Sequence, residues 1–122
     1  MSMEQKISDV LTKISSEISG FIAASVVDMD SGLTLGVHAA RADFDLSAAS
    51  AYNSEIVKSK LKAITALNLK SNLEDMLLTL SDQIHLIKLV SPTSFIYLAA
   101  DKGQTNLAIV RSVVNKYTPE LN

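Results

Sequence analysis

The amino-acid sequence predicts one α/β domain in which a helix, two strands, a long helix, three strands and a final helix follow one another. Three segments repeat apolar residues at three- and four-residue steps, the spacing of amphipathic helices. Between them lie five apolar runs of strand length, bounded by turn-forming residues. With 122 residues, 48% of them hydrophobic, the chain can bury one core but not two of ordinary size. Residues 1–122 are therefore expected to form a single domain with helices on both sides of one sheet.

The N-terminal part of the chain predicts a helix followed by a hairpin. The helix should begin near Met3 and end at Gly20, with its apolar face formed by Met3, Ile7, Val10, Leu11, Ile14 and Ile18. Phe21 to Val27 has the β-branched and aromatic composition of a strand. A turn through residues 28–32 then leads to a second strand, in which Leu33, Leu35 and Val37 alternate with more polar or small residues. We expect Gly32 to adopt a positive φ in this turn.

A long second helix is expected from Leu46 to Leu67, because this segment contains no Gly or Pro, and Asp43 or Asp45 could cap it. Its apolar residues form two adjacent stripes, one with Tyr52, Ile56, Ala63 and Leu67 and the other with Val57, Leu61 and Ile64. Together they cover about half of the circumference, whereas a helix on a single sheet needs roughly 100°. The extra width predicts a second contact surface on this helix.

Three further strands are predicted at Met76 to Leu80, Ile84 to Val90 and Ser94 to Ala100, joined by short turns that suit antiparallel neighbours. Apolar residues occupy both faces of these strands, so both faces should be covered. A last helix should start after Thr105 or Asn106 as its N-cap and end near Pro119.

Composition excludes several classes of protein. The net charge of -2 comes from 13 acidic and 11 basic residues without a run of like charge, which argues against nucleic acid as a partner. Cysteine is absent, so disulfides, thiolate metal sites and a cysteine nucleophile are excluded. The polar start resembles no secretory signal, and no apolar stretch approaches the roughly 18 residues that cross a bilayer. We expect a cytoplasmic protein that does not insert into membranes.

Asp28, Asp30 and Gly32 have the alternate spacing that begins a calcium loop. The pattern then fails, because a ligand is missing at Gly32, a glycine at position 33 and a bidentate glutamate at Ala39. A hairpin turn explains the same residues, and no metal is expected.

No catalytic or cofactor motif is complete. His38 and His85 fall on predicted strands without a nucleophile elbow or metal-ligand spacing, and we interpret them as edge or surface residues. Residues 102–105 read Lys-Gly-Gln-Thr before a helix but lack the earlier glycine of a phosphate loop. The sequence therefore predicts a non-enzymatic protein without a cofactor.

The order of elements and several local segments resemble the Roadblock/dynein light-chain family, in its short, bacterial, MglB-like branch. The resemblance covers essentially the whole chain and is carried by residues 20–28 (Gly-Phe-Ile-Ala-Ala-Ser-Val-Val-Asp), the turn through Asp30-Ser31-Gly32, and residues 106–111 (Asn-Leu-Ala-Ile-Val-Arg). It implies a profilin-like architecture: a five-stranded, mainly antiparallel sheet with the long helix on one face and two helices on the other.

The resemblance also implies a function. Members of the family pair through the long helix and the third strand, and offer a platform to small Ras-like GTPases or motor subunits. A homodimeric regulator of a small GTPase is the favoured interpretation. A structural light chain or scaffold subunit without effect on nucleotide turnover is the alternative, and an unrecognised hydrolase the least favoured.

The extra apolar width of the long helix predicts part of a dimer interface, and the resemblance implies that the strand from Met76 to Leu80 lies at the sheet edge, where it would be unpaired without a second copy. The residues assigned to this interface are Tyr52, Ile56, Val57, Lys60, Leu61, Ile64, Met76, Leu78 and Leu80. Partner contacts are assigned to Lys58 and Lys62, on the basic side of the long helix, and to Arg111 on the last helix.

Overall fold

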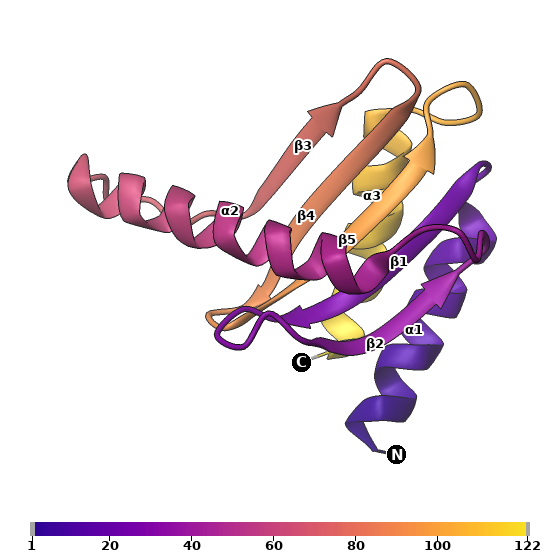
Figure 1. The fold of residues 1–122 in the computed structure, drawn as a ribbon, viewed down its shortest axis with the longest axis horizontal. Coiled ribbons are helices and arrows are strands. Elements are labelled where there is room, and N and C mark those ends of the chain that lie inside the picture. The colour runs from indigo at the N-terminus through magenta and orange to yellow at the C-terminus, as the bar shows by residue number, and fades with distance from the viewer. Residues whose placement is uncertain (1, 122) are drawn as a thin grey trace.

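The computed structural model describes residues 2–121 as one five-stranded sheet with helices on both faces (Figure 1). The strand order is β2-β1-β5-β4-β3, and every pair of neighbours is antiparallel. The elements are α1 (Met3–Glu17), β1 (Phe21–Asp28), β2 (Thr34–Ala39), α2 (Leu46–Ala66), β3 (Asp75–Thr79), β4 (Gln83–Ser91), β5 (Ser94–Asp101), α3 (Leu107–Tyr117) and the 3₁₀ turn η1 (Thr118–Leu121). The predicted order of elements is confirmed.

The two faces of the sheet carry separate apolar cores. The alternating side chains of β1, β4 and β5 pack on one side against α1 and α3, and on the other side against α2. Figure 1 shows α2 crossing the front of the sheet while α1 and α3 lie behind it. The predicted arrangement, with one long helix on one face and two helices on the other, is also confirmed.

Side-chain caps fix where the helices begin. The Asp45 carboxylate accepts a hydrogen bond of 3.0 Å from the N–H of Ala48, so Asp45 rather than Asp43 caps α2. Asn106 rather than Thr105 caps α3, with its side-chain oxygen 2.9 Å from the N–H of Ile109.

The β1–β2 turn has the conformation expected from its composition. Gly32 has a φ of 74°, which confirms the predicted positive value. The Asp28 carboxylate accepts hydrogen bonds from both the N–H and the hydroxyl of Ser31, and these bonds lower the pKa of Asp28. The first acidic residue of the calcium-like pattern therefore serves the turn itself.

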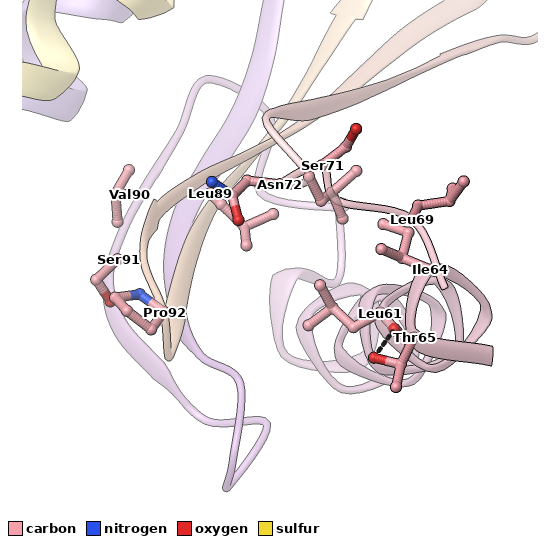
Figure 2. A pocket seen from close by; sticks show the side chains of 11 residues that line it. Leu61, Ile64, Thr65, Leu69, Ser71, Asn72, Leu89, Val90, Ser91 and Pro92 are labelled. Carbon is pink, nitrogen blue, oxygen red and sulfur yellow. Dashed lines mark hydrogen bonds between the residues drawn. The ribbon is translucent and has the colours of Figure 1, made fainter. Parts of the chain in front are cut away.

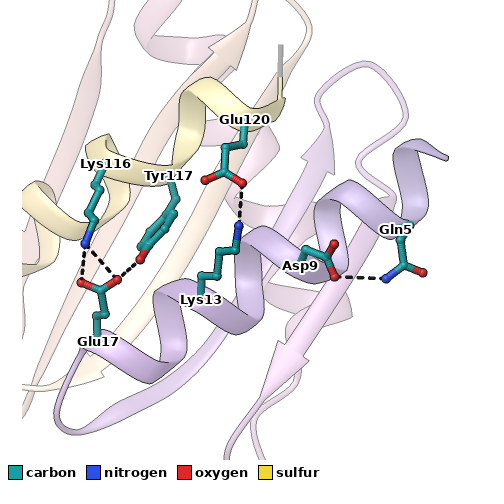
Figure 3. A network of polar contacts seen from close by, with 7 residues as sticks. All are labelled: Gln5, Asp9, Lys13, Glu17, Lys116, Tyr117 and Glu120. Carbon is teal, nitrogen blue, oxygen red and sulfur yellow. Dashed lines mark hydrogen bonds and ion pairs between the residues drawn. The ribbon is translucent and has the colours of Figure 1, made fainter. Parts of the chain in front are cut away.

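Polar contacts join α1 to the C-terminal elements behind the sheet (Figure 3). Lys13 forms an ion pair of 2.9 Å with Glu120, and Lys116 forms one of 3.0 Å with Glu17. The Tyr117 hydroxyl donates a hydrogen bond to the same Glu17 carboxylate. These contacts bind the two ends of the chain together on the face opposite α2.

The long helix extends farther than the sheet beneath it. Figure 1 shows that α2 crosses the sheet obliquely and that its C-terminal half projects beyond the edge formed by β3. The chain then returns through residues 67–74 to enter β3. This overhang leaves part of α2 and the outer part of the β3–β4 face without a covering element.

Candidate functional site

An exposed apolar stripe runs along the side of α2 that does not meet the sheet. Tyr52 is 75% exposed, Ile56 41%, and Leu67, directly after the helix, 67%. Large apolar side chains are usually exposed singly on monomeric proteins, whereas a contiguous set indicates a contact surface. The stripe has the properties predicted for the second contact surface of this helix.

A groove separates this stripe from the edge strand β3. It has a volume of about 450 Å³ and is lined by Glu55, Ile56, Ser59, Lys60, Ala63 and Met76. Glu55 and Ser59 are not among the interface residues predicted from the sequence. Their spacing from Tyr52 and Ile56 on one helix face is the signal that would have included them.

The strand β3 presents an open backbone edge beside this groove. Leu80 N–H donates to the carbonyl of Gln83, and Leu89 N–H to the carbonyl of Glu74, so the even-numbered residues of β3 are bonded to β4. The backbone groups of residues 75, 77 and 79 consequently point outward. Leu78 and Leu80 are 36% and 42% exposed on the strand and directly after it.

Val57 does not belong to this surface, which corrects the prediction that placed it in the interface. It is 0% exposed and packs in the core between α2 and the sheet. Consecutive helix residues point about 100° apart, so Val57 faces β1 and β5 while Ile56 faces outward. A helical wheel shows two stripes but does not reveal which of them meets the sheet.

Leu61 and Ile64, also assigned to the interface, are partly buried on another side of α2. They line a cavity of about 670 Å³ together with residues of the 67–74 segment, of the end of β4 and of the β4–β5 turn, among them Leu69, Leu89 and Pro92 (Figure 2). No ionisable side chain lines this cavity. Its lining consists of apolar side chains and of uncharged polar ones, among them Thr65, Ser71 and Asn72.

Of the three cations assigned to a partner, Arg111 is already engaged within the chain. Its guanidinium donates two hydrogen bonds of 2.9 Å to the Asp75 carboxylate, a bond pair that also raises the pKa of Arg111. The assignment of Arg111 to partner binding stays a prediction, because Asp75 takes hydrogen bonds from Nε and Nη2 only and the Arg111 side chain is 49% exposed. Lys58 lies 3.5 Å from Glu55, and Lys62 is exposed on α2.

His85 is half-buried and does not lie at an edge of the sheet, which was one of the two positions that the sequence predicted for it. It lies on the inner strand β4, where its ring nitrogens are 3.2 Å from the Tyr97 hydroxyl and 2.8 Å from the side-chain oxygen of Gln83. The ring of Phe44 packs against both His85 and Tyr97. Burial lowers the pKa of His85 and raises that of Tyr97 to about 12. The cluster depends on strand register, so no local sequence signal identifies it.

Other patterns weighed in the sequence have local structural roles. Asp101 accepts hydrogen bonds from the N–H of Gly103 and the side chain of Gln104, so its carboxylate occupies the loop that resembled a phosphate site. Among residues 2–121, no three acidic or histidine side chains gather as metal ligands would. Over the same residues, no helix combines the length and the apolar character needed to span a bilayer.

Comparison with known proteins identifies the fold. No protein-family model matches the chain, and no curated protein matches it in sequence. MglB of Myxococcus xanthus superposes with a TM-score of 0.88 at 14% identity, over 99% of this chain and 88% of that chain. A structure described as MglB with a tetrameric arrangement gives 0.85 at 14% identity, over 99% and 88%. A Roadblock/LC7 domain from Streptomyces avermitilis gives 0.71 at 13% identity, over 99% and 98%. The chain therefore has the Roadblock/LC7 fold that its sequence resemblance implied, in the form found in MglB structures.

Proposed function

We propose that the protein is a cytoplasmic, non-catalytic homodimer that binds a small Ras-like GTPase and changes the rate of its nucleotide cycle. The observation that carries this proposal is the exposed apolar stripe of α2 beside the open edge of β3. Exposure of the apolar stripe and of the unpaired strand edge to water is unfavourable, and a second copy related by a twofold axis would cover both surfaces.

The overhang of α2 supports a specific arrangement of the two copies. Figure 1 shows the projecting half of α2 in a single chain. In an antiparallel pair, this half of each α2 would lie over the β3–β4 face of the other copy. Tyr52 and Ile56 then meet apolar surface, and the groove beside Met76 is filled. The outward backbone groups of the two β3 strands bond to each other and join the two sheets into one.

The GTPase partner is inferred from the fold and from the resemblance to the Roadblock family. The match to MglB structures supports the choice of this branch. In the proposed dimer the two α2 helices lie side by side and carry Lys58 and Lys62 on one surface. Such a paired basic rim would attract an acidic partner and fix its orientation.

The experiment uses the Ras-like GTPases of the source organism, each loaded with a fluorescent GDP or with a slowly hydrolysed GTP analogue. Binding is measured by interferometry, and nucleotide release and GTP hydrolysis are followed with and without the protein. We expect one GTPase to bind in a nucleotide-dependent way and to change its release or hydrolysis rate. Binding to none of them would overturn the proposal, and binding without a change in either rate would support the scaffold alternative instead.

Two variants distinguish the loss of the dimer interface from a general loss of stability. Ile56→Glu places a charge in the proposed interface, whereas Ile109→Glu places the same charge on a residue that is 44% exposed and belongs to α3, on the face of the sheet opposite α2. We expect the first variant to lose GTPase regulation and the second to keep it.

A further inference from the structure

The sheet has a second open edge, formed by β2 on the side opposite β3 (Figure 1). Apolar side chains on and beside this strand are solvent-exposed: Leu33 by 67%, Leu35 by 45% and Val37 by 54%. Residues 32–40 contain no Lys, Arg, Asp, Glu or Pro, the residues that usually keep an edge strand from pairing. This edge is therefore more apolar and less protected than an edge strand that stays in water.

The hydrogen bonds of β2 leave a regular set of backbone groups unpaired by β1. The N–H of Ala40 donates to the carbonyl of Ile22 over 2.8 Å, which makes Ala40 and Ile22 a bonded pair. Bonded and non-bonded pairs alternate along an antiparallel ladder. The N–H and C=O groups of Val37 and Ala39 consequently point away from the sheet, whereas Leu35 lies at the β-bulge where the β1–β2 register shifts between Val26 and Val27.

We propose that β2 pairs with β2 of a second copy, antiparallel and about a twofold axis at Val37. In this register Val37 faces Val37 of the second copy, and Leu35 faces Ala39. The outward N–H and C=O groups of Val37 then bond to those of Val37 in the second copy. The exposed Val37 side chains pack on each other on the same face of the joined sheet.

Charge at the two ends of β2 complements this register. The turn before the strand contains Asp28 and Asp30, and Arg41 follows its end. Antiparallel pairing brings Arg41 of each copy toward the acidic turn of the other. The Arg41 side chain is 50% exposed, and its Nε lies 3.7 Å from a carboxylate oxygen of Asp43 in the same chain. This long, exposed ion pair is weak, so the guanidinium can reorient toward a second copy. An uncharged centre with opposite charges at its ends favours a second copy of the same strand over an unrelated one.

This interface is independent of the one proposed at α2 and β3, because the two lie at opposite edges of the sheet. Dimers joined through β3 would retain two free β2 edges. Pairing of these edges would give assemblies of four copies and more as concentration rises, since each dimer carries two β2 edges. The inference thus goes beyond the proposed GTPase regulation and does not require it.

A chain without cysteine allows a direct test. Val37→Cys would place two thiols across the axis, where facing residues of a bonded pair have Cα atoms about 5.5 Å apart, within the range of about 4.4–6.8 Å that a disulfide spans. Ile109→Cys is the matched control, because Ile109 is similarly exposed at 44% but lies on α3. We expect mild oxidation to give covalent pairs with Val37→Cys and not with Ile109→Cys. Equal cross-linking of both variants, or of neither, would overturn the proposal.

A second measurement does not depend on disulfide geometry. Sedimentation velocity of the wild type should reveal species larger than a dimer as concentration increases, and Val37→Lys should remove them while the circular dichroism spectrum stays unchanged. Arg41→Glu should weaken the same association at low salt. Large species that persist in Val37→Lys, or a wild type that never exceeds two copies, would contradict pairing through β2.

Discussion

The Asp75 carboxylate on the edge strand β3 accepts two parallel hydrogen bonds, each of 2.9 Å, from the guanidinium of Arg111 on α3. The side chain of Asp75 is only 15% exposed, whereas that of Arg111 is 49% exposed. Because β3 has a single sheet neighbour, β4, this contact and the packing of Leu77 attach it to the elements behind the sheet. Together they hold in place the strand that the proposed dimer uses.

We predict that Arg111→Lys loosens β3, because a lysine keeps the charge but loses the two-pronged geometry. Amide hydrogen exchange in residues 75–79 should accelerate, and the dimer should dissociate more readily. Lys13→Ala is the control, since it breaks an ion pair between α1 and Glu120 far from β3. Unchanged exchange in β3 after Arg111→Lys would refute an anchoring role.

Two glycines with positive φ should respond differently to alanine. At Gly32 the added Cβ would have room, its nearest neighbour being 3.7 Å away, so only backbone strain of about 1 kcal/mol is expected. At Gly20 the Cβ would lie 2.7 Å from the Cβ of Gln104. Gly20→Ala should therefore cost more, about 2 kcal/mol or above. Urea unfolding of both variants measures the difference, and equal losses would contradict the account of the Gly20 turn.

The His85 cluster predicts a fall in stability at acidic pH. Burial lowers the pKa of His85 in the folded state, so the unfolded chain takes up its proton first as the pH drops below about 6.5. The stability that neutral His85 contributes is present above that pH and is lost as the pH falls toward the folded-state pKa. Urea unfolding at about pH 7.5 and about pH 5.5 should reveal a smaller loss in His85→Gln than in the wild type. An identical pH dependence in His85→Gln and in the wild type would contradict this prediction. The variant His38→Gln serves as the control for the other histidine.

Much of the fold could be predicted because its signals are local. The helix spacing of Ile7, Val10, Leu11 and Ile14 identified α1, and the excess apolar width of α2 correctly indicated an exposed stripe. The features that could not be predicted depend on contacts between residues far apart in the sequence. Asp75 and Arg111 are 36 positions apart, and the Tyr97 contact of His85 follows from the β4–β5 register. Neither pairing leaves a periodic trace in the sequence.

Val57 and Ile56 give a test of which side of α2 is buried. Val57→Glu would place a carboxylate in the core at a cost of several kcal/mol, about 3 or more, and should unfold much of the protein. Ile56→Glu exposes its charge on the outer face and should leave the folded monomer nearly as stable as before. Thermal melting followed by circular dichroism compares the two, and a Val57→Glu variant that melts like the wild type would mean that α2 is rotated from the orientation described.

Sedimentation equilibrium at micromolar concentration tests the proposed dimer most directly. To exclude pairing through β2, the measurement is made in a Val37→Lys background, with Ile56→Glu and Ile109→Glu added in turn. The account predicts twice the chain mass of 13.1 kDa for the background and for Ile109→Glu, and 13.1 kDa for Ile56→Glu. A background protein that sediments as a monomer, or an Ile56→Glu variant that remains a dimer, would contradict an interface formed by α2 and β3.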